Sequence, residues 1–372
     1  MNHVEHRVEH RVELAGVTKR FRDVTAIAPL DLAIRHGEFV ALLGPAGSGK
    51  STALRLIAGL EKPSSGTIHI DGFDVTPMPP QRRDVAFVFQ ERALYPHLSV
   101  VGNIGLPMRA QRIPGNAITR RVGEVMDRLR LDHLRRRKPR HLSATEYQLV
   151  SLARAMVRDA KALCCDEPLA PFEGEHREHM RRELRAIHEE LRATTIMATR
   201  DPLDAITTAD RIVVMNEGRV VQVDTPQAIY DRPGDLFVAR YLGASAMNFL
   251  DARRGDDGAV RLVCCDLTIP VRDDGGAKPV DPQRLTLGIR PEHVRLDPRG
   301  IVAVAESSDA SADGGDGSVM LQLGGATVRT YVPPGRHIAA GERVPIRFDA
   351  SGCRWFDAVS GAALPWHTGE RR

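Results

Sequence analysis

The sequence predicts an α/β domain followed by an all-β domain. Between about residues 13 and 243, short apolar runs typical of buried parallel strands alternate with helical stretches. After about residue 243, short strand-like runs are separated by loops rich in Gly and Asp. A chain of 372 residues has room for about two domains. We therefore expect two separate cores, the first built from alternating strands and helices.

The elements can be assigned in chain order. In the first part, apolar runs predict the strands Phe39–Leu43, Val85–Phe89, Ala162–Cys165 and Thr195–Ala198. Helical periodicity predicts the helices Ser51–Gly59, Ile118–Leu131, Glu146–Val157 and Glu175–Leu191. The mixed charges of Glu173–Arg192 indicate an exposed helix with i,i+4 ion pairs. In the second part, the expected strand segments are Val260–Val271, Arg284–Leu296, Ser318–Val332 and Val344–Phe348, with Trp355 and Trp366 in the core.

Composition argues against several classes of protein. Lys and Arg number 52 against 48 Asp and Glu, and aromatic residues are 5%, which is too little charge and too few rings to indicate nucleic-acid binding. No apolar run approaches the roughly 18 residues of a membrane span. The polar stretch Met1–Glu13 predicts no signal peptide. The five cysteines lack zinc-ligand spacing and indicate buried thiols in a reducing cytosol.

A basic run, Arg135–Arg140, has more than one interpretation. The simplest is a solvated helix end and loop. The alternatives are a patch that binds anionic lipid headgroups and a patch that binds nucleic acid.

The strongest motif is a phosphate-binding loop that follows the strand Phe39–Leu43 and precedes the first helix. It reads Gly44-Pro45-Ala46-Gly47-Ser48-Gly49-Lys50-Ser51-Thr52, which matches G-x-x-x-x-G-K-[ST]. Its glycines let backbone N–H groups turn toward a phosphate, and the helix N-terminus adds a positive dipole. Lys50 places a cation between the β- and γ-phosphates, and Ser51 can ligate Mg²⁺. The motif predicts binding of a nucleoside triphosphate.

An acidic pair ends the strand Ala162–Cys165. Asp166 is positioned to hold Mg²⁺, and Glu167 is positioned to polarise the attacking water as general base. Alone, this pair could be a strand end that meets solvent, but a phosphate loop needs an acidic element on a neighbouring strand. The two motifs together therefore predict nucleotide hydrolysis.

Through these motifs and several further stretches, the chain resembles the ATP-binding subunits of ABC importers. It resembles most those for maltose, other sugars and glycerol phosphate. The stretches that carry the likeness are Thr18–Phe21, Phe89-Gln90, Ala93–Val100, Asp166–Leu169, Ala209–Ile212, Gly218-Arg219, Thr225-Pro226, Met247–Phe249 and Gly288–His293. The resemblance implies an α/β P-loop cassette with a RecA-like core, at residues 12–243. It also implies a helical subdomain at about 91–158 and an OB-like or TOBE-like regulatory β-domain at 244–372.

The resemblance implies partners as well as a fold. Two cassettes, in a homodimer or a heterodimer, would trap two ATP molecules and drive two transmembrane permease subunits. A solute-binding protein would be an indirect partner, and the chain would lie at the cytoplasmic face of the cell membrane. Mg²⁺ would accompany ATP. Sugar is the expected solute class.

The same resemblance implies roles for individual residues. Phe21 would stack on adenine. Gln90 would sense the γ-phosphate and Mg²⁺, and residues 94–100 would face the permease. The signature residues that would contact the partner's ATP are Ser143, Ala144, Thr145 and Glu146.

The chain departs from the family pattern at three places. The signature, normally Leu-Ser-Gly-Gly-Gln, reads Leu142-Ser143-Ala144-Thr145-Glu146, so it has side chains where the backbone should approach phosphate. Arg200 occupies the switch-histidine position, and arginine only donates hydrogen bonds. The D-loop reads Ala170–Glu173 in place of Ser-Asn-Leu-Asp. These departures predict near-normal ATP binding with weakened hydrolysis.

Two functions of different classes therefore remain. The first is the energy-coupling ATPase of an importer, and the second is a nucleotide-binding pseudo-ATPase that supports an intact cassette. A P-loop kinase or GTPase is disfavoured because no N-K-x-D motif is present, and a repair or translation cassette because neither a tandem cassette nor a coiled coil is present.

Overall fold

The computed structural model describes residues 10–90, 94–158, 160–191, 193–242, 247–255, 258–265, 267–273, 278–309 and 317–368. Contacts divide the chain into two compact units, Met1–Gln227 and Ala228–Arg372. Each unit is described separately. The family-derived domain limits, 12–243 and 244–372, stay predictions.

The first unit contains ten strands and six α-helices among its described residues. The strands are β1 (His10–Phe21), β2 (Val24–Arg35), β3 (Phe39–Leu43), β4 (Ser65–Ile70), β5 (Phe73–Asp74), β6 (Val85–Val88), β7 (Ala162–Asp166), β8 (Thr194–Thr199), β9 (Arg211–Asn216) and β10 (Arg219–Asp224). The helices are α1 (Lys50–Ala58), α2 (Val100–Ala110), α3 (Gly115–Arg128), α4 (Ala144–Met156), α5 (Gly174–Leu191) and α6 (Pro202–Thr208).

A six-stranded sheet forms the centre of this unit, in the order β10-β9-β3-β8-β7-β6. All pairs are parallel except that of β10 with β9 at the edge. Every residue of β3, β7 and β8 is buried, as expected for strands covered on both faces. The four predicted strands are confirmed to within one residue at each end.

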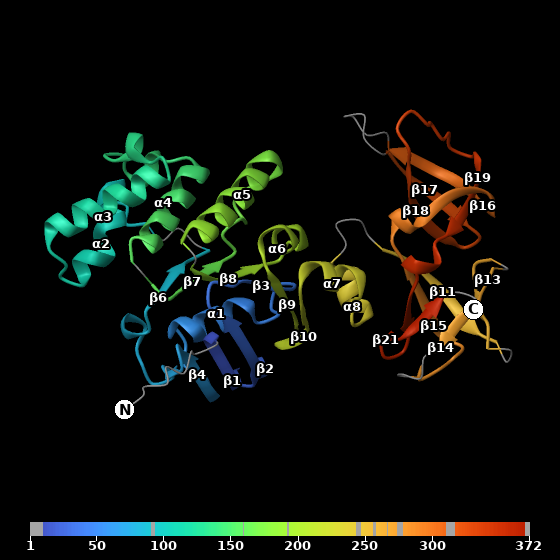
Figure 1. The fold of residues 1–372 in the computed structure, drawn as a ribbon, viewed down its shortest axis with the longest axis horizontal. Coiled ribbons are helices and arrows are strands. Elements are labelled where there is room, and N and C mark those ends of the chain that lie inside the picture. Colours follow the sequence, from blue (N-terminus) through green and yellow to red (C-terminus); the bar gives the residue numbers. More distant parts are fainter. Residues whose placement is uncertain are drawn as a thin grey trace, which may run out of the picture. The chain divides into compact units, whose positions relative to one another are not determined.

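A second sheet, of order β2-β1-β4-β5, is antiparallel. The helix α1 contacts β2 as well as β6, β7 and β8, so it lies between the two sheets, and their facing side chains share one apolar core. In Figure 1, α5 and α6 lie on the other face of the parallel sheet. The sequence analysis did not separate this antiparallel sheet from the α/β core, because its pairing is made by residues far apart in the chain.

The helices α2, α3 and α4 pack on one another and form a group at one end of the unit (Figure 1). Two details differ from the sequence analysis. The helix α3 begins and ends three residues before the predicted Ile118–Leu131, because Arg130, with a φ of 54°, stops it. The helix α2 was not predicted, since its Gly and Pro content resembles a loop. Ser99 caps α2, and Asn103 Nδ2 donates to the carbonyls of Tyr95, Leu98 and Ser99.

The second unit is rich in strands. Its elements are α7 (Pro226–Asp231, which begins two residues before the unit), α8 (Leu236–Tyr241), β11 (Asn248–Arg254), β12 (Val260–Leu262), β13 (Thr268–Ile269), β14 (Val271–Asp273), β15 (Leu285–Ile289), β16 (Val294–Asp309), β17 (Gly317–Leu323), β18 (Ala326–Val332), β19 (Arg343–Phe348), β20 (Arg354–Asp357), β21 (Ala363–Leu364) and β22 (Trp366–Thr368). They form the sheets β13-β12-β11-β15-β20-β21 and β18-β17-β16-β19, with a separate pair of β14 and β22.

A large apolar core fills most of this unit, beside a small separate cluster of Ala239, Met247 and Phe356. Trp355 and Trp366 are buried in the large core, as predicted. Three predicted strand segments prove to be composite, and one of them, the segment 318–332, contains most of β17 and all of β18, which pair as an antiparallel hairpin. The segment 260–271 contains β12, β13 and the start of β14, and the segment 284–296 is interrupted by a short turn of helix at Pro291–His293. The five cysteines are free thiols, of which Cys264 and Cys265 are only half-buried, so the prediction that all are buried is wrong for this pair.

Candidate functional site

The phosphate loop (residues 44–52) connects the end of β3 to the start of α1. Gly49 has a φ of 99°, and a Cβ there would lie 2.6 Å from Ile27 Cδ1. A Cβ on Gly44 would lie 2.1 Å from the carbonyl oxygen of Met215. Only glycine fits at these two positions, so close packing against the sheet sets the backbone path of the loop. The helix α1 begins at Lys50, one residue before the predicted start at Ser51.

The side chain of Lys50 folds back over the phosphate loop and bonds to two of its residues. Its side chain is almost fully buried, and Nζ donates to Pro45 O at 2.7 Å and to Ser48 Oγ at 3.1 Å. Burial lowers the pKa of the Lys50 ammonium, and the nearby carboxylates of Glu167 and Asp166 oppose that shift. A buried cation held by neutral oxygens is an arrangement that a phosphate would complete.

Ser51 and Asp166 meet beside the loop. Ser51 Oγ donates to Asp166 Oδ1 at 2.7 Å, and Asp166 lies buried at the carboxyl end of β7. Burial raises the pKa of Asp166, against the hydrogen bond from Ser51. A hydroxyl and a carboxylate oxygen are hard donors of the kind that Mg²⁺ prefers, so these two residues fit a magnesium site.

Glu167 accepts hydrogen bonds from two residues that the family resemblance singled out separately, Gln90 and Arg200. Gln90 Nε2 donates to Glu167 Oε2 at 3.2 Å, and Arg200 Nη2 donates to the same oxygen at 2.5 Å. The backbone of Glu167 has a φ of 46°, and its N–H donates to Ala198 O at 3.0 Å. Glu167 Oε1 accepts no hydrogen bond from the described residues. The structure therefore brings Gln90, Glu167 and Arg200 together, with Arg200 as an ion-pair partner of the carboxylate.

The signature residues form the start of α4. Ser143 caps the helix: its Oγ accepts from Glu146 N at 3.2 Å, while Glu146 Oε2 accepts from Ser143 N at 2.7 Å. Glu146 Oε1 also lies 3.4 Å from Arg137 Nη1. Its carboxylate thus turns back on its own helix, where it is partly neutralised.

Phe21, the expected adenine platform, lies at the end of β1 with 43% of its surface exposed. Lys19 Nζ lies 4.6 Å from the centroid of the ring, a cation–π contact. Ala144 is exposed and Thr145 half-buried on the first turn of α4. Neither Phe21 nor these signature residues contact the Gln90–Glu167–Arg200 cluster through any bond that the described residues make.

A network of hydrogen bonds and ion pairs around Asp204, which the sequence did not predict, supports the site. Asp204 is fully buried at the start of α6 and accepts from Arg177 Nη2 at 2.7 Å and from Thr199 Oγ1 at 3.0 Å. Arg181 Nε lies 3.4 Å from the same carboxylate. Thr199 precedes Arg200, so the network holds the turn that carries Arg200. The i,i+4 prediction for α5 was thus only partly right: Arg185 pairs with Glu189, but two other arginines reach across to α6.

Comparison with known proteins places this geometry in a family. The ABC transporter family matches residues 27–170, the MalK OB fold domain residues 245–294 and the TOBE domain residues 287–356. The trehalose/maltose import ATP-binding protein MalK of Thermococcus litoralis is 39% identical over 373 residues, which cover 95% of this chain and 99% of that protein. The chain belongs to the ABC transporter ATP-binding proteins. The α/β cassette fold followed by OB and TOBE domains is therefore confirmed.

Two further comparisons agree with this membership. The sn-glycerol-3-phosphate import ATP-binding protein UgpC of Yersinia enterocolitica is 36% identical over 361 residues, 95% of this ABC chain and 99% of UgpC. A solved dimer of the bacterial ABC transporter cassette MJ0796 aligns with a TM-score of 0.53 at 28% identity, over 58% of this chain and 98% of that one. Among the described residues, no helix combines the length and apolarity needed to cross a membrane.

Proposed function

We propose that this chain is the energy-coupling ATPase subunit of an ABC importer for a carbohydrate or a glycerol phosphate, with weakened hydrolysis. The observation that carries the proposal is the phosphate loop with its buried Lys50, set beside Ser51, Asp166 and Glu167. The relatives MalK, a trehalose/maltose import protein, and UgpC, an sn-glycerol-3-phosphate import protein, support the transport class and the solute class.

In this proposal, ATP lies against residues 44–52. Backbone N–H groups of this loop surround the β-phosphate, and they come from Gly44, Ala46, Gly47, Ser48, Gly49, Lys50, Ser51 and Thr52. Pro45 has no N–H, and its carbonyl accepts from Lys50 in the absence of nucleotide. Lys50 gives up its contacts with Pro45 O and Ser48 Oγ for phosphate oxygens. The exposed ring of Phe21 stacks on adenine.

Ser51, Asp166 and Gln90 would hold Mg²⁺. When bound, the ion neutralises charge that develops on the β- and γ-phosphates. Because Ser51 and Asp166 already share a hydrogen bond, their oxygens are placed before the ion arrives.

The partners follow from family membership. A second cassette, in a homodimer or a heterodimer, would present Ser143, Ala144, Thr145 and Glu146 to the nucleotide. Two permease subunits would receive the motion at the cytoplasmic face of the membrane, and a solute-binding protein would act through them. The solved structure of MJ0796 is a dimer, and because this chain covers 98% of the matched MJ0796 chain, it supports cassette pairing.

Hydrolysis is weakened because the general base has a competing partner. Glu167 must accept a proton from water, yet its Oε2 already accepts from Gln90 and Arg200. Arg200 carries a permanent charge and only donates, so it cannot relay a proton as histidine can. Oε1 remains available to water, which leaves room for slow turnover.

The Arg200–Glu167 ion pair also favours a second function, a pseudo-ATPase that binds nucleotide and supports an intact cassette. ATP turnover of the purified chain separates the two. If the chain hydrolyses ATP, Glu167→Gln lowers kcat at least about 100-fold, the scale of a lost general base. Equal rates for Glu167→Gln and wild type would select the pseudo-ATPase.

A second variant, at Arg200, tests whether hydrolysis is weakened by the Arg200–Glu167 ion pair. Replacing Arg200 by histidine removes the permanent charge from Glu167 Oε2, so we expect kcat to rise about tenfold or more. Arg182→His, at an exposed position on α5, is the matched control and should leave kcat unchanged. A wild-type rate equal to that of an intact homologue would contradict weakened hydrolysis.

A further inference from the structure

A small pocket lies at the edge of the parallel sheet opposite the phosphate loop. It has a volume of about 220 Å³ and is lined at the amino ends of β6 and β7, by Ala86 and by Lys161 and Leu163. The nucleotide residues, in contrast, follow the carboxyl ends of β3 and β7. The pocket is therefore separate from the site already described.

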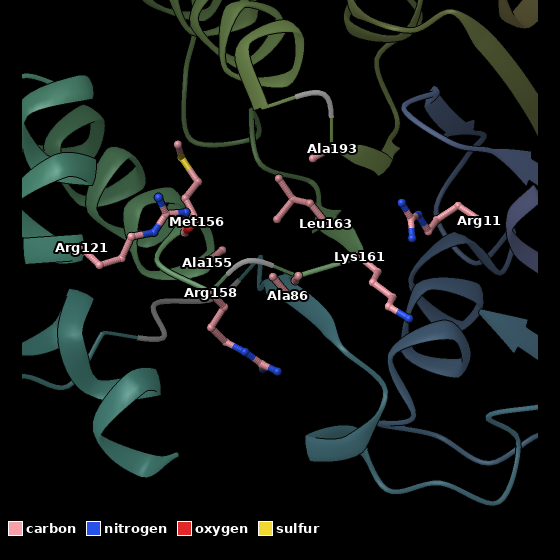
Figure 2. Close-up of a pocket in the computed structure, with 10 residues that line it drawn as sticks. Arg11, Ala86, Arg121, Ala155, Met156, Arg158, Lys161, Leu163 and Ala193 are labelled. Atoms are coloured by element: carbon pink, nitrogen blue, oxygen red, sulfur yellow. Dashed lines mark hydrogen bonds between the residues drawn. The ribbon is translucent and has the colours of Figure 1, made fainter. Parts of the chain in front are cut away.

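Four cationic side chains surround this pocket. In Figure 2, Arg121 and Arg158 lie on the side of α4, Arg11 and Lys161 lie toward the other side, and Ala86 and Leu163 lie between them. No carboxylate is among the described residues that line it. Cations from β1, α3 and the connection between α4 and β7 are thus brought together only by the fold.

Part of this positive charge is compensated. Asp71 lies 2.6 Å from Arg11 Nη1 and 2.8 Å from Lys161 Nζ. Burial alone would raise the pKa of Asp71, but the hydrogen bond from Lys161 and the charge of Arg11 outweigh it and lower that pKa, so Asp71 is ionised. One carboxylate therefore serves two cations.

The remaining positive charge is matched only in part. Arg121 Nη1 lies 3.5 Å from Glu124, which is half-exposed, and Arg158 makes no ion pair or hydrogen bond within the described residues. Arg11 Nε is buried and has no hydrogen-bond acceptor in the described part of the chain. Counted over the described residues alone, four cations against the carboxylates of Asp71 and Glu124 leave an excess of about two positive charges, which a dianion would balance.

We propose that this pocket binds a small organic phosphate. The arginine forks and the lysine ammonium match a phosphate dianion, and a short carbon skeleton fits the apolar floor formed by Ala86 and Leu163, both of which are buried. A free metabolite fits better than a lipid headgroup, because none of the exposed large apolar side chains of the described residues lines this pocket. The proposal does not depend on the function of the nucleotide site.

The test is calorimetric titration of the full chain with ethyl phosphate. Mg²⁺ and a non-hydrolysable ATP analogue are present at saturation so that the phosphate loop is blocked. Nucleotide binding is titrated separately, which keeps a failure of the proposed function distinct from a failure of this pocket. Ethyl sulfate, a monoanion of similar size, tests the preference for a dianion.

We expect saturable binding of one ethyl phosphate per chain and weaker binding of ethyl sulfate. Arg158→Gln and Lys161→Gln should each weaken binding about tenfold or more, the scale of one charge-assisted hydrogen bond. Arg182→Gln, an equal charge change at an exposed position on α5, should leave affinity unchanged. Thermal unfolding of each variant checks that it folds.

Several outcomes would overturn the proposal. One is that ethyl phosphate shows no saturable binding to the folded wild type. Another is that Arg182→Gln weakens binding as much as the pocket variants do, and a third is that both pocket variants keep full affinity.

A separate experiment uses phosphatidylglycerol vesicles. Sedimentation of the chain with such vesicles, lost in Arg158→Gln while ethyl phosphate fails to bind, would assign the pocket to a lipid surface instead.

Discussion

The buried ammonium of Lys50 has two neutral oxygens for partners, at 2.7 and 3.1 Å, and forms no ion pair within the described residues. At the same scale, Glu167 Oε2 has one cationic and one neutral donor, at 2.5 and 3.2 Å. Lys50 therefore has carboxylates nearby but none within ion-pair distance among the described residues, whereas Glu167 already has a cationic partner. The proposal of near-normal binding with weakened hydrolysis rests on this difference between the two residues.

We predict that Lys50→Ala weakens nucleotide binding at least about tenfold, because one charge-assisted contact with the phosphates is lost. Titration with a fluorescent ATP analogue measures the effect. Lys62→Ala, which removes an exposed lysine of the same unit, is the control. Unchanged affinity in Lys50→Ala would show that nucleotide does not bind at this loop.

At the scale of elements, the start of α4 satisfies its own amide groups. Ser143 and Glu146 form a reciprocal capping box, and Arg137 lies beside the Glu146 carboxylate. In the proposed dimer, this helix start would face a phosphate of the partner's nucleotide. A carboxylate at that position repels phosphate, although it stabilises the helix.

Two substitutions of Glu146 separate these effects. Glu146→Gln can keep the capping hydrogen bond without the charge, so we expect unchanged stability and stronger dimer formation with Mg²⁺ and ATP. Glu146→Ala removes the cap and should lower the free energy of unfolding by about 0.5–1 kcal/mol.

Analytical ultracentrifugation and denaturant unfolding provide the two measurements. Equal dimerisation of Glu146→Gln and wild type would mean that the carboxylate does not oppose closure.

At the scale of the whole molecule, the two units have separate apolar cores. The two tryptophans of the chain, Trp355 and Trp366, are both buried in the second unit. The longest helices, α3, α4 and α5, belong to the first unit. Tryptophan fluorescence therefore reports on the second unit alone, while helical circular dichroism reports mainly on the first.

We predict that Mg²⁺ with a non-hydrolysable ATP analogue stabilises only the first unit. At 100 times its Kd, a ligand contributes about 2.7 kcal/mol, which raises the Tm of a domain of this size by about 5–10 °C. The circular dichroism transition should shift and the fluorescence transition should not. Equal shifts of both would contradict independent cores, and Lys50→Ala should abolish the shift.

The predictable part of the fold is the part with local signals. The strands β3, β7 and β8 are wholly buried and built around short apolar runs, and α1 begins within the phosphate loop, so these elements were assigned to within one residue. The helix α2 was missed because Ser99 and Asn103 stabilise it through contacts that composition does not reveal. The composite segments of the second unit were missed because strand breaks depend on sheet pairing.

By itself, the sequence determined the chemistry of the phosphate loop. Strand, turn and helix follow one another within a few residues, and each glycine and Lys50 acts in that short span. Only the tertiary structure decided what Glu167 and the cationic pocket contact. Gln90 lies 77 residues from Glu167 and Arg200 lies 33 residues away, and Arg11 reaches Lys161 through Asp71 on another strand connection. Such contacts arise when sheets and helices pack, because no local pattern along the chain specifies which distant charges will meet.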